Sequence, residues 1–284
     1  VSKWISTLKS YYDHSGDKEF VSSLDHIIEH QIKYLSTFID QDNLINLKKE
    51  SIVNISDWSS STRFGQVSYQ QSVSFKAFND AAYLKEAIGD HKNAENYIKI
   101  SKKIKEASNR LLFDKFIGAY RDLRIDESLS DRATLDSNVL ALEYELADMS
   151  YTNSILKYIS DNLWTQHGTR LINKPYKISS GLFMKDVISP SMNSHEAKIR
   201  FKNNTADSAI EVIKKTYEGM VDYGTGTFWE FKSISNDPET LNSSLAHGWS
   251  GNVSYVLSEG ILGVSPIEPG FKVFSFNPHI GNLS

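Results

Sequence analysis

Apolar residues recur every three or four positions along several stretches of the chain, which is the spacing of an amphipathic helix. The clearest stripe consists of Phe20, Leu24, Ile27, Ile28, Ile32, Leu35, Phe38 and Ile39. The same spacing, or a weaker form of it, predicts further helices over 3–13, 68–88, 91–111, 134–147, 152–163, 209–220 and 242–262. We therefore expect a chain built mainly from about eight or nine helices.

Two of the links between these helices are short and have the same sequence. Gly16-Asp17 precedes the clearest stripe, and Gly89-Asp90 separates two later helices. Glycine can end one helix in the left-handed conformation, and aspartate can cap the start of the next. Because such tight links join antiparallel neighbours, they predict helical hairpins.

Long irregular stretches separate the other helices, and the chain closes on a strand pattern. The stretches 40–66, 113–133, 165–204 and 222–241 are rich in Ser, Asn, Gly and aromatic residues. Loops of this length in a compact domain usually serve a function. From Phe271 to Phe276 apolar and polar residues alternate, which predicts a strand.

Composition places the chain among ordinary globular proteins, because its 284 residues are 40% hydrophobic and 23% charged. The formal net charge of −4 offers no basic surplus for a phosphate backbone, so we expect no nucleic-acid partner. The apolar runs are too short for a bilayer, so we expect no membrane partner. The absence of cysteine excludes disulfides, thiolate metal sites and cysteine nucleophiles.

Two histidine patterns have partial metal-site spacing. His26 and His30 stand four residues apart, but they lie opposite the apolar stripe and are expected to face water. His195-Glu196 begins the HExxH motif, yet Ile199 occupies the position that needs a second histidine. We expect no metal site and no cofactor.

Tryptophan, carboxylate and histidine residues gather instead in the loops. Aromatic rings suit the apolar face of a sugar, and Asp, Glu and His hydrogen-bond to hydroxyl groups. Glycoside hydrolysis needs a pair of carboxyl groups and such a cradle. The segments that offer these side chains are Asp57-Trp58, Phe228-Trp229-Glu230 and Leu245-Ala246-His247-Gly248-Trp249.

The order of these segments resembles the bacterial α-L-rhamnosidase family, whose catalytic domain is an all-α barrel of six helical hairpins, an (α/α)6 toroid. The stretch 259–271 looks like the family's passage from the last barrel helix into a C-terminal β-sandwich. The resemblance implies a partial (α/α)6 catalytic barrel over 1–265, and a linker with the first strand of a β domain over 266–284. The matching segments are Asp57-Trp58, Ile88-Gly89-Asp90, Asn138-Val139-Leu140-Ala141-Leu142, Gly226-Thr227-Phe228-Trp229-Glu230 and Ser244-Leu245-Ala246-His247.

The resemblance also implies an activity and roles for single residues. The chain would belong to an inverting glycoside hydrolase that acts on terminal α-L-rhamnosides. Glu230 would be the general base that activates water. Trp58 and Trp229 would wall the sugar pocket, and Asp57 and His247 would bind the substrate.

One part of the family pattern has no counterpart in this chain. The family's general acid lies in an Arg-Asp-Glu-Arg segment early in the barrel, upstream of every segment matched here. Tyr120-Arg121-Asp122-Leu123-Arg124 resembles that segment only superficially, because it follows the second helical hairpin. The chain also opens on Val1 without a methionine. We therefore expect a barrel that lacks its first hairpins and its general acid.

An incomplete barrel would expose the apolar flanks of its end hairpins. We therefore expect association with the missing N-terminal part of the polypeptide or with a second copy, beside a carbohydrate substrate. Two other functions stay open: a non-catalytic glycan-binding homologue, and another six-hairpin glycosidase or glycoside phosphorylase. The Lys-, Asn- and Ile-rich composition indicates a bacterial source, with a cytoplasmic location favoured and secretion left open.

Overall fold

The computed structural model describes residues 2–47, 64–174, 187–223, 225–235 and 243–283. Short 3-10 turns occupy Met149–Tyr151 (η1), Gly248–Asn252 (η4) and Pro269–Phe271 (η6), and a π turn at Leu257–Ile261 (η5) continues the last helix. The α-helices are α1 (Ser2–Ser15), α2 (Lys18–Ser23), α3 (Asp25–Ser36), α4 (Ser68–Ile88), α5 (His91–Leu111), α6 (Leu135–Glu143), α7 (Thr152–Asn162), α8 (Pro190–Lys202), α9 (Ala206–Asp222) and α10 (Val253–Val256).

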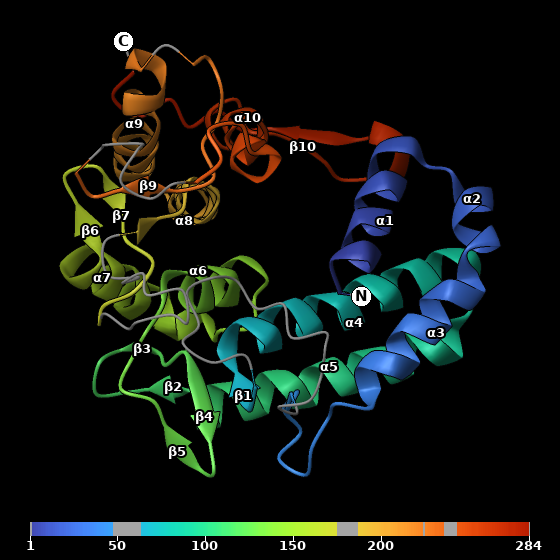
Figure 1. Ribbon diagram of the computed structural model, residues 1–284. Helices are drawn as coiled ribbons and strands as arrows, with labels where there is room; N and C mark the ends of the chain where they lie inside the picture. The colour runs from blue at the N-terminus through green and yellow to red at the C-terminus, as the bar shows by residue number, and fades with distance from the viewer. Residues whose placement is uncertain (1, 48–63, 175–186, 224, 236–242, 284) are drawn as a thin grey trace.

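The helices alternate between an inner and an outer layer around a curved arc (Figure 1). In the inner layer α1 packs on α4, α4 on α6, α6 on α8 and α8 on α10. The outer helices α3, α5, α7 and α9 each follow or precede an inner partner, so that α4 with α5 and α8 with α9 form hairpins. This is the arrangement of an α/α toroid, and it confirms the predicted all-α fold class.

Both Gly-Asp links have the predicted geometry. Gly89 ends α4 with a φ of 93°, in the left-handed region that favours glycine. The Asp90 side chain then accepts a hydrogen bond from the backbone N–H of Asn93, at 3.2 Å, and caps α5. Asp17 caps α2 in the same way by accepting from the N–H of Phe20 at 2.9 Å. Local chemistry therefore determines these two turns.

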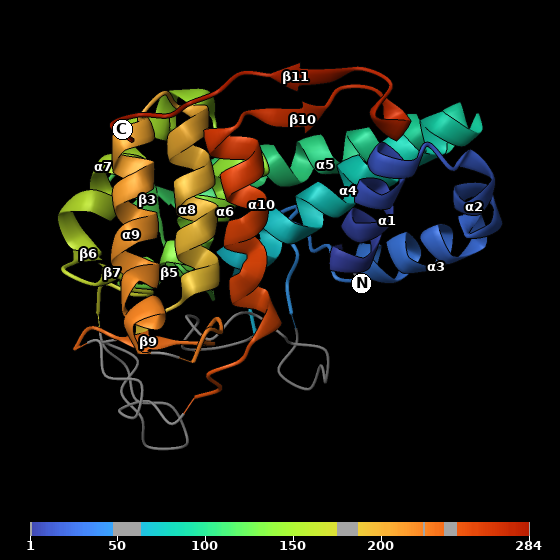
Figure 2. The ribbon, with the colours of Figure 1, turned by 90° about the horizontal axis from the view of Figure 1, so that it is seen from above.

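The longer connections carry short antiparallel strands. Most of them run from an outer helix to the next inner helix, so they gather where the inner helices begin, while β10 and β11 lie at the opposite end (Figure 2). The pairs are β1 (Gln66–Val67) with β4 (Leu123–Ile125), β4 with β5 (Ser128–Leu129), β2 (Phe113–Asp114) with β3 (Ala119–Tyr120), β6 (Trp164–Thr165) with β7 (Gly168–Thr169), β8 (Val187–Ile188) with β9 (Lys232–Ser233), and β10 (Val264–Pro266) with β11 (Phe274–Phe276).

Three helical segments differ from the prediction. The helix predicted over 242–262 begins only at Gly248, as a 3-10 turn, and its α-helical part is Val253–Val256. The stripe over 20–39 is interrupted at Leu24, which separates α2 from α3, and the helix ends at Ser36. The stretch 165–204, predicted to be irregular, contains α8. α8 packs against α6, α9 and α10, so apolar and polar residues are buried all round its axis and leave no stripe. Its start does carry a signal, because Ser189 caps it and Pro190 occupies the first turn.

The strand predicted over 271–276 is shorter in the structure, and it pairs with a segment that precedes it in the chain. Only Phe274–Phe276 forms a strand, β11, and its partner is β10. The preceding turn lies against α1, where Gly16 approaches Gly270 closely and the His14 and Phe271 rings are 5.3 Å apart. The hairpin thereby bridges α10 and α1 (Figures 1 and 2). The division into 1–265 and 266–284 remains a prediction.

An ion cluster around one buried lysine ties α3, α4 and the start of α5 together. Lys85 of α4 is fully buried, and its Nζ lies 2.5 Å from Asp25 Oδ1, 2.7 Å from Glu29 Oε1 and 3.0 Å from Asp90 Oδ2. Burial alone would lower the pKa of Lys85, but the hydrogen bonds to these three carboxylates raise it above its ordinary value. The ammonium group therefore remains charged and holds the three elements together.

Replacing Lys85 by Met should lower the free energy of unfolding by about 1–3 kcal/mol at neutral pH, because three neighbouring carboxylates lose their counter-charge. Hydrogen bonds from Asn93 and Lys85 hold the pKa of Asp90 below its ordinary value. Such a carboxylate stabilises the fold above its unfolded-state pKa and loses this effect as the pH falls. The difference between the two proteins in urea denaturation should therefore shrink in acid. Lys92→Met, at an exposed position of α5, is the control and should change little.

None of the helices in the described ranges combines the length and the hydrophobicity needed to span a bilayer.

Candidate active site

Glu230 and His247 meet at the end of the toroid where the long connections gather. His247 Nε2 lies 3.9 Å from Glu230 Oε1, and the two side chains are 27% and 23% exposed. Both are therefore shielded by the protein and still accessible to a small ligand. The structure thus brings together two of the residues that sequence reasoning assigned to a site, across 17 positions of chain.

Backbone hydrogen bonds fix this pair. The Glu230 N–H donates to the Ser244 carbonyl at 2.8 Å, and the His247 N–H donates to the Phe228 carbonyl at 2.8 Å. The Ser244 N–H also approaches Glu230 Oε2 at 3.4 Å. The two segments therefore run side by side like a short antiparallel ladder, which holds the carboxylate and the imidazole in place.

Trp229 is in the core and does not wall a pocket. Its side chain is fully buried in a small cluster with Tyr217, Met220 and Val253. The indole N–H points to the Thr225 hydroxyl at 3.3 Å. The expectation that Trp229 lines a sugar pocket is therefore wrong for this structure, because no part of the ring is accessible. Its contact with the core instead anchors the segment that carries Glu230.

Trp249 occupies the exposed position that had been expected for Trp229. Its side chain is 57% exposed, and its ring stands edge-on to the His247 ring at 5.1 Å. Lys3 at the start of α1 lies over the same indole, with its Nζ 5.3 Å from the ring centroid, and 5.9 Å from the ring of Tyr69. Lys3 therefore lies between the accessible ring of Trp249 and the buried ring of Tyr69, at the start of α4.

A cleft of about 710 Å³ extends from Lys3 along α1. His195 of α8 contributes to its wall, and the ring Nδ1 lies 2.5 Å from Glu143 Oε2. Burial on its own would raise the pKa of Glu143, but the charges of His195 and Lys198 hold it at about 2. Glu196, the next residue along α8, pairs with Arg200. The His195-Glu196 dipeptide therefore stabilises the helix layer through ion pairs.

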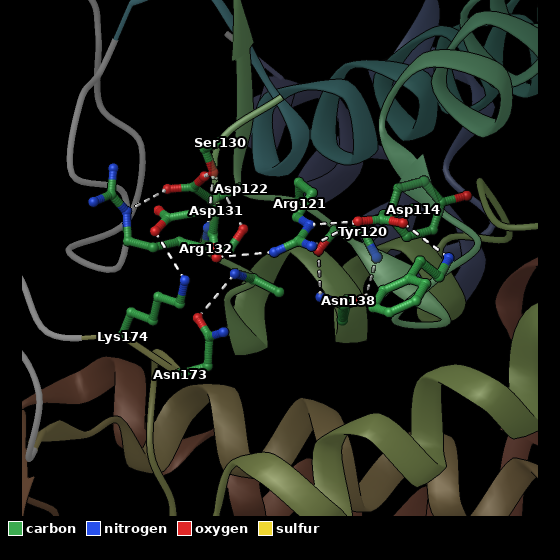
Figure 3. Close-up of polar contacts among 12 residues, drawn as sticks. Asp114, Tyr120, Arg121, Asp122, Ser130, Asp131, Arg132, Asn138, Asn173 and Lys174 are labelled. Atoms are coloured by element: carbon green, nitrogen blue, oxygen red, sulfur yellow. Dashed lines mark hydrogen bonds and ion pairs between the residues drawn. The ribbon is translucent and has the colours of Figure 1, made fainter. Parts of the chain in front are cut away.

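The Arg-Asp pattern near position 121 is structural (Figure 3). Asp122 is fully buried, accepts a hydrogen bond from the Ser130 hydroxyl and lies 3.4 Å from Arg132 Nε. Burial raises the pKa of Asp122 above its ordinary value. Arg121 is paired with Asp114 at 2.6 Å. These side chains hold the connection between α5 and α6 together through contacts within 114–132.

The remaining expected residues are placed as follows. Asp57 and Trp58 lie outside the described residues. His26 and His30 are exposed on α3, as their position opposite the apolar stripe predicts. The carboxylates of Asp25, Glu29 and Asp90 are close enough to hold a cation together, and the cation they contact is the Lys85 ammonium.

Many solved structures have folds similar to that of this chain, among them the following three. A structure described as a GH78 family rhamnosidase of Bacillus sp. GL1 matches with a TM-score of 0.79 and 22% identity, over 97% of this chain and 27% of its own. A rhamnosidase from Klebsiella oxytoca with rhamnose bound matches with a TM-score of 0.68 and 21% identity, over 89% and 45%. A structure described as "Sialidase" matches with a TM-score of 0.74 and 16% identity, over 95% and 26%.

These similarities establish the fold. The chain spans about a quarter of the Bacillus structure and less than half of the Klebsiella structure. No protein-family model and no curated protein matches the chain. Its toroid is thus one that glycosidases use, and the chemistry of such a fold depends on the residues of its site.

Proposed function

We propose that the chain forms part of the catalytic barrel of a glycoside hydrolase that removes terminal α-L-rhamnose with inversion, with Glu230 as the general base. The observation that carries the proposal is the Glu230–His247 pair beside the exposed ring of Trp249. A carboxylate, an imidazole and an accessible aromatic face are what binding and hydrolysis of a sugar require. They lie where the inner helices begin, next to the long connections.

A detail of His247 supports a functional role. Its Nδ1 is buried and has no hydrogen-bond partner among the residues described. An unpaired buried polar atom costs free energy, and functional sites are where such costs are tolerated. The Nε2 of the same ring faces Glu230. We propose that His247 hydrogen-bonds to a sugar hydroxyl while Glu230 contacts the attacking water.

In the proposed reaction Glu230 accepts a proton from water as the water oxygen attacks the anomeric carbon. The bond from that carbon to the aglycone oxygen breaks, and the leaving oxygen takes a proton from a general acid. We assign the acid to no residue of this chain, since the resemblance locates it outside the matched segments. Asp57 and Trp58 remain proposed substrate-binding residues, and Trp249 takes the stacking role first expected of Trp229.

The choice of rhamnose is supported by two of the similar structures, which are described as rhamnosidases, one of them with rhamnose bound. The third is described as a sialidase, so the fold occurs with more than one sugar. The resemblance of the Trp229-Glu230 and His247 segments to the rhamnosidase pattern favours rhamnose.

The test is the stereochemistry of hydrolysis of an aryl α-L-rhamnoside with an acidic phenol as leaving group. Such a phenol departs with little protonation, so turnover does not depend on the unassigned acid. We expect proton NMR to show β-L-rhamnose as the first product, before it mutarotates. First release of the α anomer would contradict the inverting assignment. Faster hydrolysis of the matching aryl glucoside or fucoside would contradict the assignment of rhamnose as the substrate sugar.

The two other functions predict different results in the same assay. A glycan-binding homologue would bind rhamnose in calorimetry and release no phenol above the rate without protein. A glycoside phosphorylase would release sugar phosphate only when inorganic phosphate is present. Phosphate-independent release of free rhamnose would exclude both.

A further inference from the structure

A second hollow lies on the outer layer, beside the C-terminal half of α5 and apart from the Glu230–His247 pair. Its volume is about 530 Å³. We call it the α5 groove, and its lining residues are Lys102, Lys105, Glu106, Asn109, Arg110, Lys115, Asp148 and Tyr151.

The α5 groove is basic in a protein whose net charge is negative. Four of its lining side chains are cationic and two are acidic, whereas the whole chain carries −4. Lys102, Arg110 and Lys115 are exposed, and in the described ranges none of them forms an ion pair. Arg110 does act on Asp42, whose pKa it helps Arg124 and Gln66 to lower. Among the described residues Lys102 and Lys115 form no ion pair, so their charges are available to an anion.

The floor of the groove is rigid. Asn109, a buried residue, donates through Nδ2 to the carbonyls of Lys105 and Leu146 at 2.7 and 2.8 Å. Its Oδ1 accepts from the Tyr120 hydroxyl at 2.7 Å and from the Asp148 N–H at 3.0 Å. This single side chain connects α5 to two neighbouring segments, so the groove is preformed and an anion would not have to order it.

Two large apolar residues adjoin lining residues of the groove in the sequence. Phe116, next to Lys115 in the β2–β3 turn, is 96% exposed, and Met149, next to Asp148, is 91% exposed. Tyr151, which lines the groove, is held by stacking on Phe113, with ring centroids 3.8 Å apart and an angle of 3° between the rings. The exposed Phe116 ring, next to Lys115 in the chain, is therefore available for contact with a ligand.

We propose that the α5 groove binds an acidic polysaccharide, with carboxylate or sulfate groups of the polymer on Lys102, Arg110 and Lys115 and the Phe116 ring against a sugar face. Charge complementarity favours a polyanion, and a ring beside cations suits a sugar acid. The choice of a glycan over another polyanion rests on the proposed function. The groove would then hold a charged polymer at a distance from the reacting bond.

The experiment measures binding of the chain to polygalacturonate by calorimetry at low salt, with fully methyl-esterified pectin as the uncharged control polymer. The Lys102→Ala/Lys115→Ala double variant should weaken binding about tenfold and reduce its salt dependence. Phe116→Ala should weaken it about fivefold and leave the salt dependence unchanged. The matched control is Lys92→Ala/Lys214→Ala, which removes two exposed lysines elsewhere and should bind like the parent chain.

Several outcomes would overturn the proposal. These are equal binding of the esterified polymer, equal weakening by the control variant, and tighter binding to single-stranded DNA or to phosphatidylglycerol vesicles. Its failure is distinct from failure of the proposed function. Rhamnoside hydrolysis without polygalacturonate binding would reject only the proposed ligand of the α5 groove. Polygalacturonate binding without rhamnoside hydrolysis would reject only the proposed enzymatic function.

Discussion

Replacing Glu230 by Gln should slow hydrolysis of the activated aryl α-L-rhamnoside by about 10²–10⁴-fold, which is the usual contribution of a positioned general base. The amide has nearly the shape of the carboxylate, and its oxygen can still accept from the Ser244 N–H. The backbone bond from Glu230 to Ser244 does not involve the side chain at all. The loss should therefore lie in kcat, with thermal unfolding unchanged.

A rescue experiment separates a base from a structural carboxylate. With Glu230→Ala, azide can enter the vacated space and attack the anomeric carbon without giving up a proton, so activity should return and yield β-rhamnosyl azide. Glu268→Gln, which changes an exposed carboxylate far along the chain, should behave as the parent does. Equal rates for the parent and Glu230→Gln would reject Glu230 as the base.

Replacing Trp229 by Ala should lower the free energy of unfolding by about 3–5 kcal/mol, the usual cost of removing a large buried aromatic side chain. The ring is fully buried against Tyr217, Met220 and Val253, so its removal leaves a cavity in the layer beneath Glu230. Urea denaturation followed by circular dichroism measures the loss. Activity should fall in parallel with the folded fraction.

Trp249→Ala is the matched comparison, because it removes the same side chain from an exposed position. Its stability should change by less than about 0.5 kcal/mol. Binding of rhamnose should weaken instead, since the exposed indole is the proposed stacking surface. The opposite pattern, with stability lost at Trp249 and affinity lost at Trp229, would show that the two roles are assigned the wrong way round.

Residues close in sequence accounted for much of the fold. The apolar stripes of α5 and α9 could be predicted because a helix that buries one face repeats its pattern every turn. The Gly89-Asp90 link could be predicted because capping depends on neighbouring residues. The sequence pattern did not predict α8, because this helix lies in the inner layer between α6, α9 and α10 and has buried residues on all sides. The break at Leu24 also depended on packing, because the stripe continues through it.

At the candidate active site, too, some features followed from the sequence and others only from tertiary structure. The sequence alone identified Glu230 and His247 as candidates, because chemistry depends on residue type and the loop segments carried a recognisable order. Which tryptophan is accessible was decided by tertiary structure. Trp229 adjoins Glu230 in sequence, but its side chain points into the cluster formed by α9 and α10, whereas Trp249 lies two residues beyond His247 and faces solvent beside α1.

The α5 groove is likewise a product of tertiary structure. Its cations come from α5 and from the β2–β3 turn, and its lining residues Lys102 and Tyr151 are 49 positions apart. Local sequence therefore determined the helices, their caps and the residue types that can do chemistry, since each depends on neighbours within one turn. Tertiary packing decided burial, the 3.9 Å approach of His247 to Glu230 and the gathering of unpaired charge, since each depends on contacts between distant segments.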